Sequence, residues 1–229
     1  MSLPADAAAG VARLPIAILI SGRGTNMRAI AERAAAGRLP IDVRVVISDQ
    51  PAAEGLQTAA AMNIATRVLV PRDFADRASY DQALVRLLTE YEPKLVVLAG
   101  FMRILTPHFI GAFAGRILNV HPSLLPGYRG LYTHRRVLEA GEALHGVSVH
   151  FVTEELDGGP VIVQAEVPVL TGDTETSLSA RVQRAEHRIY PQAIDWFARG
   201  RLLLKDGRAW LDGKPLDTPV REPAEVPGG

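Results

Sequence analysis

Five short runs of almost wholly apolar residues, spaced along the first half of the chain, constrain its fold more than any other feature. They cover residues 14–20, 43–47, 66–70, 95–99 and 116–120. Between them lie segments with helical spacing or helix-starting residues, at 26–36, 52–62, 80–91 and from 106 onward. Strands that are apolar throughout are buried on both faces, as in parallel sheets whose crossover connections are helices. The first half therefore predicts a mostly parallel sheet with helices on both sides.

The second half predicts a change in the sheet and a helical end. Residues 146–152 and 161–169 have the composition of strands joined by a polar loop, which favours a mixed sheet there. Residues 174–199 carry apolar side chains at helical spacing, with a kink expected at Pro191, and Asp206-Gly207 marks a hairpin turn within 201–214. We expect an α/β, Rossmann-like three-layer fold with a mostly parallel central sheet, mixed in the C-terminal half, and a C-terminal long helix and β-hairpin.

Length and composition indicate one domain that acts on small molecules. The chain has 229 residues, 48% of them apolar, so we expect a single domain over 14–216 with flexible termini at 1–13 and 217–229. Lys and Arg balance Asp and Glu at 25 each, so no nucleic-acid partner is expected. There is no cysteine, no secretory signal and no run of 18 apolar residues, which favours a cytoplasmic protein with no membrane partner. A monomer or a homodimer is equally compatible with the sequence.

The loop after the first strand, Ser21-Gly-Arg-Gly-Thr-Asn26, has the composition of a phosphate seat. Glycines let the backbone approach a ligand, and the free N–H groups of the following helix point at it. The alternative is a dinucleotide-binding turn, because Gly22-x-Gly24 begins the G-x-G-x-x-G pattern. Met27 stands where the third glycine of that pattern would be, which favours a terminal phosphate; a plain strand-to-helix turn remains the third possibility.

Asn119 and His121 end the fifth apolar run, and Pro122 follows at once. Residues two apart on a strand point to the same side, so the two polar side chains converge on one spot. The amide can donate to an oxyanion, a contact whose removal typically costs about 3–4 kcal/mol of barrier, and the imidazole can move a proton near neutral pH. The pair can also be structural, with a buried Asn and a satisfied His that hold a loop.

Asp157 lies in the turn of Thr153-Glu-Glu-Leu-Asp-Gly-Gly159, directly after a later strand. A carboxylate beside His121 would raise the proton affinity of the imidazole and fix its orientation. Asp-Gly is also a common turn, and the sequence alone does not bring the two loops together. Ser123 beside His121 invites a hydrolase interpretation, but the chain lacks the G-x-S-x-G turn that such a nucleophile needs.

Five longer segments, in chain order, are similar to one known family. They are LISGRGTN (19–26), VVLAGFMRIL (96–105), LNVHPSLLPGYRG (118–130), GVSVHFVTEELDGGPVIVQ (146–164) and RVQRAEHRIYP (181–191). They resemble the glycinamide ribonucleotide formyltransferases, and the likeness runs from about residue 14 to about 213. The resemblance implies transfer of the formyl group of 10-formyltetrahydrofolate, as donor co-substrate, to the glycyl amine of glycinamide ribonucleotide in de novo purine biosynthesis, without a metal.

The resemblance also implies roles for individual residues. The catalytic residues would be Asn119, His121 and Asp157. The ribonucleotide would be bound by Gly24, Thr25, Asn26, Gln183, Arg184, Ala185 and Glu186. The folate would be bound by Arg77, Met102, Arg103, Ile104, Leu105, Asn119, Thr153, Glu154, Glu155, Leu156 and Asp157. Arg77 and Glu186 can each also be solvent-facing helix residues, and His150 can be structural or lie near the cleft.

Tyr132 departs from the family pattern, which leads us to expect a histidine after Gly130-Leu131. If that histidine supports the carboxylate, the support is altered here.

Two related enzymes on the same scaffold remain as alternatives, a formyltetrahydrofolate hydrolase and another N-formyltransferase. The hydrolase would carry a regulatory domain before the first strand, where only about 13 residues precede it, and a tRNA-directed enzyme would carry a basic C-terminal domain.

Overall fold

The structure, a computed structural model, describes residues 13–223. Of the flexible termini expected at 1–13 and 217–229, residues 1–12 and 224–229 lie outside the described residues. No helix within 13–223 is long and apolar enough to cross a membrane.

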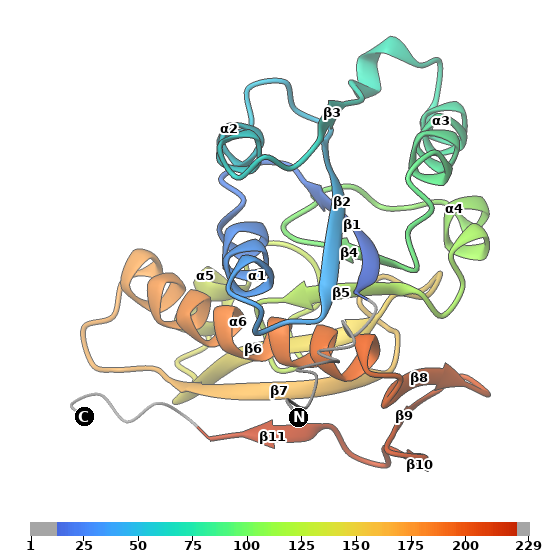
Figure 1. Ribbon diagram of the computed structural model, residues 1–229. Coiled ribbons are helices and arrows are strands. Elements are labelled where there is room, and N and C mark those ends of the chain that lie inside the picture. The colour runs from blue at the N-terminus through green and yellow to red at the C-terminus, as the bar shows by residue number, and fades with distance from the viewer. Residues whose placement is uncertain (1–12, 224–229) are drawn as a thin grey trace, which may run out of the picture.

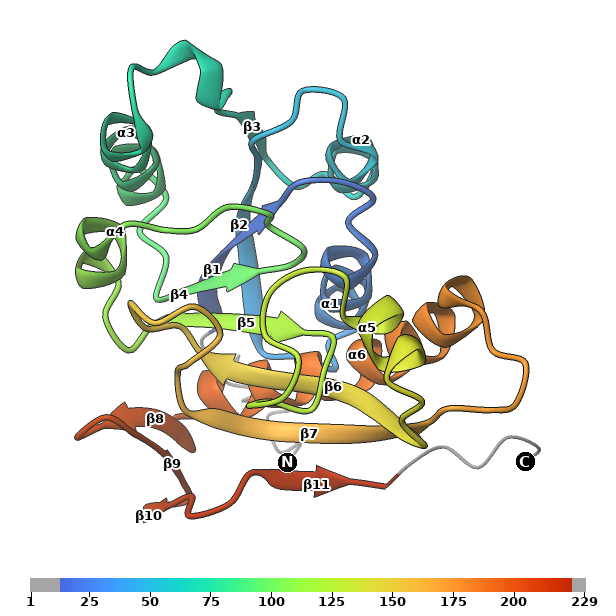
Figure 2. The same cartoon turned by 180° about the vertical axis from the view of Figure 1, so that it is seen from behind.

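The centre of the molecule is an eight-stranded sheet, in the order β11-β7-β6-β5-β4-β1-β2-β3 (Figures 1 and 2). The strands are β1 (Leu14–Ile20), β2 (Ile41–Ser48), β3 (Thr66–Val68), β4 (Leu95–Leu98), β5 (Ile117–His121), β6 (Leu144–Phe151), β7 (Val161–Pro168) and β11 (Val220–Glu222). The first five pair in parallel, whereas β6 is antiparallel to both β5 and β7. The predicted mixed sheet is confirmed, and its change of direction falls between β5 and β6.

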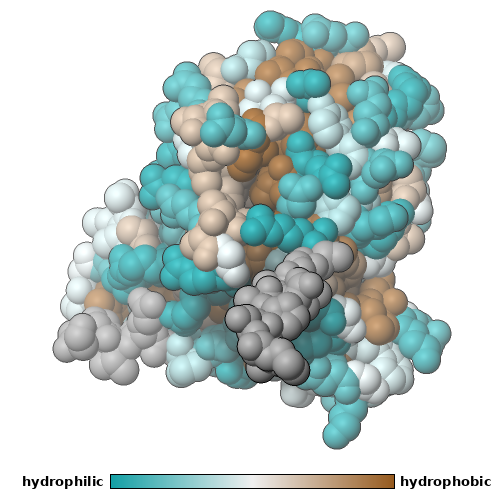
Figure 3. Space-filling model, viewed as in Figure 1, coloured by the Kyte–Doolittle hydropathy of each residue, from teal (hydrophilic) through white to brown (hydrophobic). Residues whose placement is uncertain are grey.

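Helices cover both faces of the sheet. They are α1 (Thr25–Ala35), α2 (Glu54–Ala61), α3 (Arg77–Thr89), α4 (Pro107–Ala112), α5 (Thr133–Glu139) and α6 (Glu175–Ala198), with a 3-10 turn at Pro71–Asp73. Side chains of β1 alternate between the faces: Ile18 packs on the side of α1, α2, α5 and α6, and Leu19 on the side of α3 and α4. The surface seen in Figure 3 is mainly hydrophilic, with hydrophobic residues visible in a strip of its upper part. The three-layer prediction is confirmed.

The long helix α6 fixes the two strands beside the change of direction. It begins at a capping box formed by Thr174 and Ser177 and continues as one helix through Pro191, where a kink was expected. The buried hydroxyl of Tyr190 lies 3.0 Å from the carbonyl oxygen of Leu98 and 2.9 Å from that of Leu118. One side chain of α6 therefore bonds to both β4 and β5, directly before Asn119.

The C-terminal segment contains more strands than the sequence predicts. The hairpin of β8 (Leu202–Lys205) and β9 (Arg208–Leu211) is confirmed, with the turn at Asp206-Gly207, and β10 (Lys214–Pro215) adds a third strand. Within the terminus expected to be flexible from residue 217, the structure contains β11, which pairs in parallel with β7. This three-residue strand has no periodic pattern of its own. It forms because the edge of β7 offers free backbone groups and because Gln192 of α6 donates to Glu222 at 2.9 Å.

Tyr190→Phe tests the link between α6 and the strands. Loss of the hydroxyl removes a buried hydrogen bond and should lower the free energy of unfolding by about 1–2 kcal/mol, measured by urea denaturation. Tyr91→Phe, at a half-buried tyrosine just beyond α3, is the matched control and should change stability by less than about 0.5 kcal/mol. Equal effects of the two substitutions would contradict the assignment.

A histidine pair that joins α5 to β6 predicts a pH-dependent loss of stability. Nδ1 of His134 lies 3.0 Å from Nε2 of the fully buried His145, and burial lowers the pKa of His145 to about 4. The unfolded chain takes up this proton near pH 6.5, so the stabilisation is complete above that pH and is lost as the pH falls towards 4. The free energy of unfolding should fall by about 1–3 kcal/mol across this window. His145→Gln should reduce that fall, and an unchanged pH dependence would contradict the prediction.

Candidate active site

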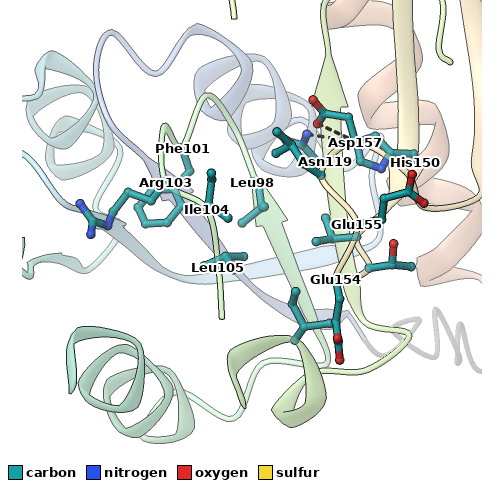
Figure 4. A pocket seen from close by; sticks show the side chains of 14 residues that line it. Leu98, Phe101, Arg103, Ile104, Leu105, Asn119, His150, Glu154, Glu155 and Asp157 are labelled. Carbon is teal, nitrogen blue, oxygen red and sulfur yellow. Dashed lines mark hydrogen bonds and ion pairs between the residues drawn. The ribbon is translucent and has the colours of Figure 1, made fainter. Parts of the chain in front are cut away.

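The polar ends of the strands surround one cavity at the change of direction in the sheet. A cavity of about 410 Å³ is lined by Asn119, His121 and Asp157 together with the loop that follows β4. A smaller neighbouring cavity of about 100 Å³ extends between that loop and residues 152–157 (Figure 4). The side chains of Asn119, His150 and Asp157 lie close together at one side of this pocket, as Figure 4 shows. The structure thus brings together the three residues that the sequence placed in two separate loops.

Asn119 is held by a neutral histidine on the neighbouring strand. In the antiparallel register Asn119 lies opposite His150, and its Nδ2 is 3.1 Å from Nε2 of that ring. Nδ1 of His150 is 2.8 Å from the carbonyl oxygen of Phe151, which can only accept, so Nδ1 carries the proton and Nε2 accepts from the amide. Burial lowers the pKa of His150 to about 4, which keeps the ring neutral near pH 7. One amide hydrogen of Asn119 is left to donate into the cavity.

Both ring nitrogens of His121 face oxygen atoms, unlike those of His150. Its Nε2 lies 3.0 Å from the carbonyl oxygen of Tyr128 and its Nδ1 lies 3.5 Å from Oδ2 of Asp157. The carbonyl oxygen of Tyr128 can only accept, so Nε2 carries a proton and donates to it, while Nδ1 faces the carboxylate. Both side chains are less than 10% exposed, so water screens this pair little. The two contacts therefore fix the orientation of the ring at the wall of the cavity.

Asp157 is fixed by a tight turn. It adopts the left-handed conformation at φ 49°, and its Oδ2 accepts the backbone N–H of Gly130 at 2.9 Å. The chain then returns to the sheet through Gly159, where a Cβ atom would lie 1.9 Å from the carbonyl oxygen of Phe151. Only glycine fits this close approach, so the turn that carries the carboxylate depends on it.

The first part of the loop after His121 rests on buried side chains of β6 and β7. Ser148 donates to the carbonyl oxygen of Ser123 at 2.6 Å and accepts the N–H of Leu125 at 3.0 Å. Gln164 donates to the carbonyl oxygen of Leu125 and to Ser148, each at 2.8 Å. Since every one of these groups is buried and paired, residues 122–127 form a rigid wall beside the cavity.

The glycine loop after β1 forms a third cavity, of about 330 Å³. Gly24 stands before α1 in the left-handed conformation at φ 68°, and a Cβ atom there would lie 2.8 Å from Cα of Gly55. The helix starts behind this turn, so its free N–H groups are available to an anion. Met27, the residue that argued against a dinucleotide turn, is completely buried in the core.

Helix α6 supplies the other wall of this third cavity. Gln183 donates to Thr25 at 3.1 Å, and Asn26 donates to Glu186 at 2.6 Å. Burial raises the pKa of Glu186, while the hydrogen bond from Asn26 acts in the opposite direction. The first and third cavities share wall residues, namely Gly100, Met102 and Pro122. They are therefore parts of one continuous site.

Most of the expected site residues line the cavities, in two groups, and three of them do not. The residues expected in the folate pocket other than Arg77 line the first two cavities. Thr25, Gln183 and their neighbours Gly24, Asn26 and Glu186 line the third. Arg77 is exposed at the start of α3, Arg184 is exposed and bonds to the carbonyl oxygen of Ala180, and Ala185 is packed in the core. These three residues line none of the cavities described here.

Several side chains and backbone groups of the site could not be assigned from the sequence. His150 was left undecided, because its contact with Asn119 depends on strand register. The backbone groups of Tyr128 and Gly130 have no side-chain signature at all. Tyr132 lines the cavity at 63% exposure and stacks on Arg135 at 5.3 Å, so the expected histidine position does reach the site. Within 13–223 no group of three or more His, Asp or Glu side chains has metal-binding geometry.

Comparison with known proteins shows the family of the chain. The family model described as formyl transferase matches residues 14–194. The chain is 53% identical over 201 residues to the phosphoribosylglycinamide formyltransferase of Escherichia coli (strain K12), covering 88% of this chain and 95% of that protein. It is 41% identical over 189 residues to the human trifunctional purine biosynthetic protein adenosine-3, covering 82% of this chain and 19% of that protein.

A solved structure extends the likeness to the fold. The phosphoribosylglycinamide formyltransferase of Coxiella burnetii, solved in complex with CHES, has a TM-score of 0.88 and 46% identity, covering 92% of this chain and all of that one. With a family model over most of the chain and close relatives of nearly equal length, the protein belongs to the phosphoribosylglycinamide formyltransferases.

Proposed function

We propose that this protein transfers the formyl group of 10-formyltetrahydrofolate to the glycyl amine of glycinamide ribonucleotide, a step of de novo purine biosynthesis, with Asn119, His121 and Asp157 as catalytic residues. One observation carries the proposal. An amide donor and a histidine–aspartate pair line a cavity that is continuous with a glycine-lined anion seat. A reacting carbonyl and a phosphate-bearing amine can therefore be held side by side.

The chemistry needs stabilisation of one developing negative charge. The amine nitrogen attacks the formyl carbon, and the carbonyl oxygen becomes an oxyanion as the new C–N bond forms. Asn119 supplies an N–H donor, oriented by His150, and the imidazolium of His121 supplies positive charge at the cavity wall. Both groups are already in place before the reaction, so little reorganisation is needed.

In the second half of the reaction the negative charge of the oxyanion is removed. The oxyanion collapses, the bond from the formyl carbon to the folate nitrogen breaks, and the nitrogen takes the proton that the attacking amine has lost. Asp157 lies beside His121 and can hold the water that carries this proton, while it keeps the imidazole protonated. The products are the formylated amine and tetrahydrofolate, so atoms and charge balance.

The cavity walls match the two substrates. Apolar side chains that remain exposed at the mouth, Met102, Ile104 and Leu156, would be buried by a flat aromatic donor. Thr25 and Asn26 at the start of α1 would hold the phosphate of the ribonucleotide, with Gln183 and Glu186 facing the rest of it. Arg77, Arg184 and Ala185 stay predictions with no contact to the cavities in this conformation.

The primary experiment is incubation with glycinamide ribonucleotide and 10-formyltetrahydrofolate, with separate assays for the formylated product and for free formate. Formylated product should form in equal amount to tetrahydrofolate. Production of formate without the formylated ribonucleotide would contradict the proposal and would favour a hydrolase.

His121→Ala should lower kcat by about 10²–10⁴-fold, because the imidazolium is lost from beside the oxyanion. Binding of both substrates, followed by calorimetry, should persist. His108→Ala, at an exposed histidine on α4, is the matched control and should leave kcat unchanged. Near-normal turnover of His121→Ala would remove that residue from the mechanism.

Asn26→Ala should weaken the ribonucleotide chiefly. The substitution removes a donor from the anion seat and leaves the buried carboxylate of Glu186 without its 2.6 Å partner, next to the phosphate. We expect the KM of the ribonucleotide to rise by about tenfold or more, as for loss of one charge-assisted hydrogen bond, with the KM of the donor changed little. An effect confined to the donor would place the phosphate elsewhere.

A further inference from the structure

We propose that Arg136, on α5, is a positioning residue for formyl transfer. It holds residues 128–131, a segment that supplies the backbone partners of His121 and Asp157. The inference rests on the proposed catalytic roles of those two residues. Arg136 itself lines none of the cavities described above, so its effect would be transmitted through the segment.

The guanidinium of Arg136 makes three contacts with the segment. Its Nη1 donates to the carbonyl oxygen of Arg129 at 2.7 Å and lies 3.5 Å from that of Leu131. Its Cζ lies 5.3 Å from the centre of the Tyr128 ring, a cation–π distance. The Tyr128 hydroxyl donates to Glu142 at 2.7 Å, just beyond the same helix. A planar guanidinium can satisfy this combination of stacking and backbone donation, and an ammonium can satisfy only part of it.

The segment divides its backbone groups between the helix and the site. The carbonyl oxygens of Arg129 and Leu131 turn to Arg136, whereas the carbonyl oxygen of Tyr128 accepts from His121 at 3.0 Å. The N–H of Gly130 donates to Asp157 at 2.9 Å. Both ends of the His121–Asp157 pair therefore have a backbone partner in this one segment.

Local sequence does not favour this conformation. Tyr128 adopts φ 54° and Gly130 adopts φ 79°, so two left-handed positions fall within three residues. A bulky residue in that region is strained and persists when surrounding contacts hold it. The conformation of residues 128–131 thus depends on an anchor from outside the segment.

Arg136 is the strongest such anchor that the structure describes. Residues 122–127 are braced by the buried side chains of Ser148 and Gln164, but that network stops before Tyr128. The ion pair between Arg129 and Glu155 also reaches across to the loop of Asp157, but its side chains are 39% and 65% exposed. Exposed side-chain pairs contribute little to stability. The contacts of Arg136 are exposed as well, but they reach two backbone carbonyl oxygens and the Tyr128 ring, so they restrain more of residues 128–131 than that one side-chain pair does.

The test compares Arg136→Ala, Arg136→Lys and Arg86→Ala, the last at an exposed arginine on α3 far along the chain from the site loops. For Arg136→Ala we expect kcat to fall about tenfold, with the KM of the ribonucleotide within about twofold, because the anion seat is not touched. Arg136→Lys should give an intermediate kcat, since it keeps the donor and the charge. Arg86→Ala should match the parent protein.

A second measurement, independent of activity, is hydrogen exchange of the Gly130 amide by NMR. Exchange should be faster in Arg136→Ala and close to the parent in Arg86→Ala. Unchanged exchange, or faster exchange with an unchanged kcat, would overturn the inference. A loss of kcat that comes with an equal loss of ribonucleotide binding and a lower melting temperature would assign a general structural role instead and would also overturn it.

Failure of the proposed function has a different signature. If His121→Ala and Asp157→Asn both turn over normally, the catalytic roles are wrong whatever Arg136 does. If those two variants are inactive and Arg136→Ala is fully active, only the positioning role is wrong.

Discussion

The contact between His121 and Asp157 is the interaction on which the rest of the site depends. His121 ends β5 and Asp157 lies in the loop after β6, which is antiparallel to β5, so the two residues meet only because this loop returns to the end of β5. That return is possible because Gly159 has no side chain beside Phe151. The parallel half of the sheet supplies the anion seat, the antiparallel half supplies the carboxylate, and the boundary between them supplies the reacting space.

Two histidines of one cluster have different hydrogen-bonding partners. His150 donates to a backbone carbonyl and accepts from an amide, and burial lowers its pKa to about 4, so it is neutral. His121 lies between a carbonyl oxygen and a carboxylate. The neutral ring of His150 can accept the hydrogen bond that orients Asn119, whereas both ring nitrogens of His121 face oxygen acceptors. The two histidines are therefore suited to different tasks.

Much of the fold and the core of the site could be predicted from the sequence, because their signals are local. Apolar strands, the glycine loop and the two-residue spacing of Asn119 and His121 each follow from a few neighbouring residues. The parts that were missed depend on contacts between distant segments. Helix α5 is only seven residues long, and β11 forms by pairing with the edge of β7. The contact of Asn119 with His150 requires the register of β5 on β6, which no local pattern specifies.

The loop after β5 shows why such long-range contacts matter for function. Its first part is fixed by buried and fully paired groups of the sheet, and a change there would leave polar atoms buried without partners, at high cost. Its second part carries the groups that contact His121 and Asp157, yet it is held from an exposed face of α5. Exposed contacts are inexpensive to alter and can be replaced by others of similar geometry. If Arg136 positions residues 128–131 as proposed, surface residues such as Arg136 and Glu142 can adjust the alignment of His121 and Asp157, while the buried network holds the cavity wall.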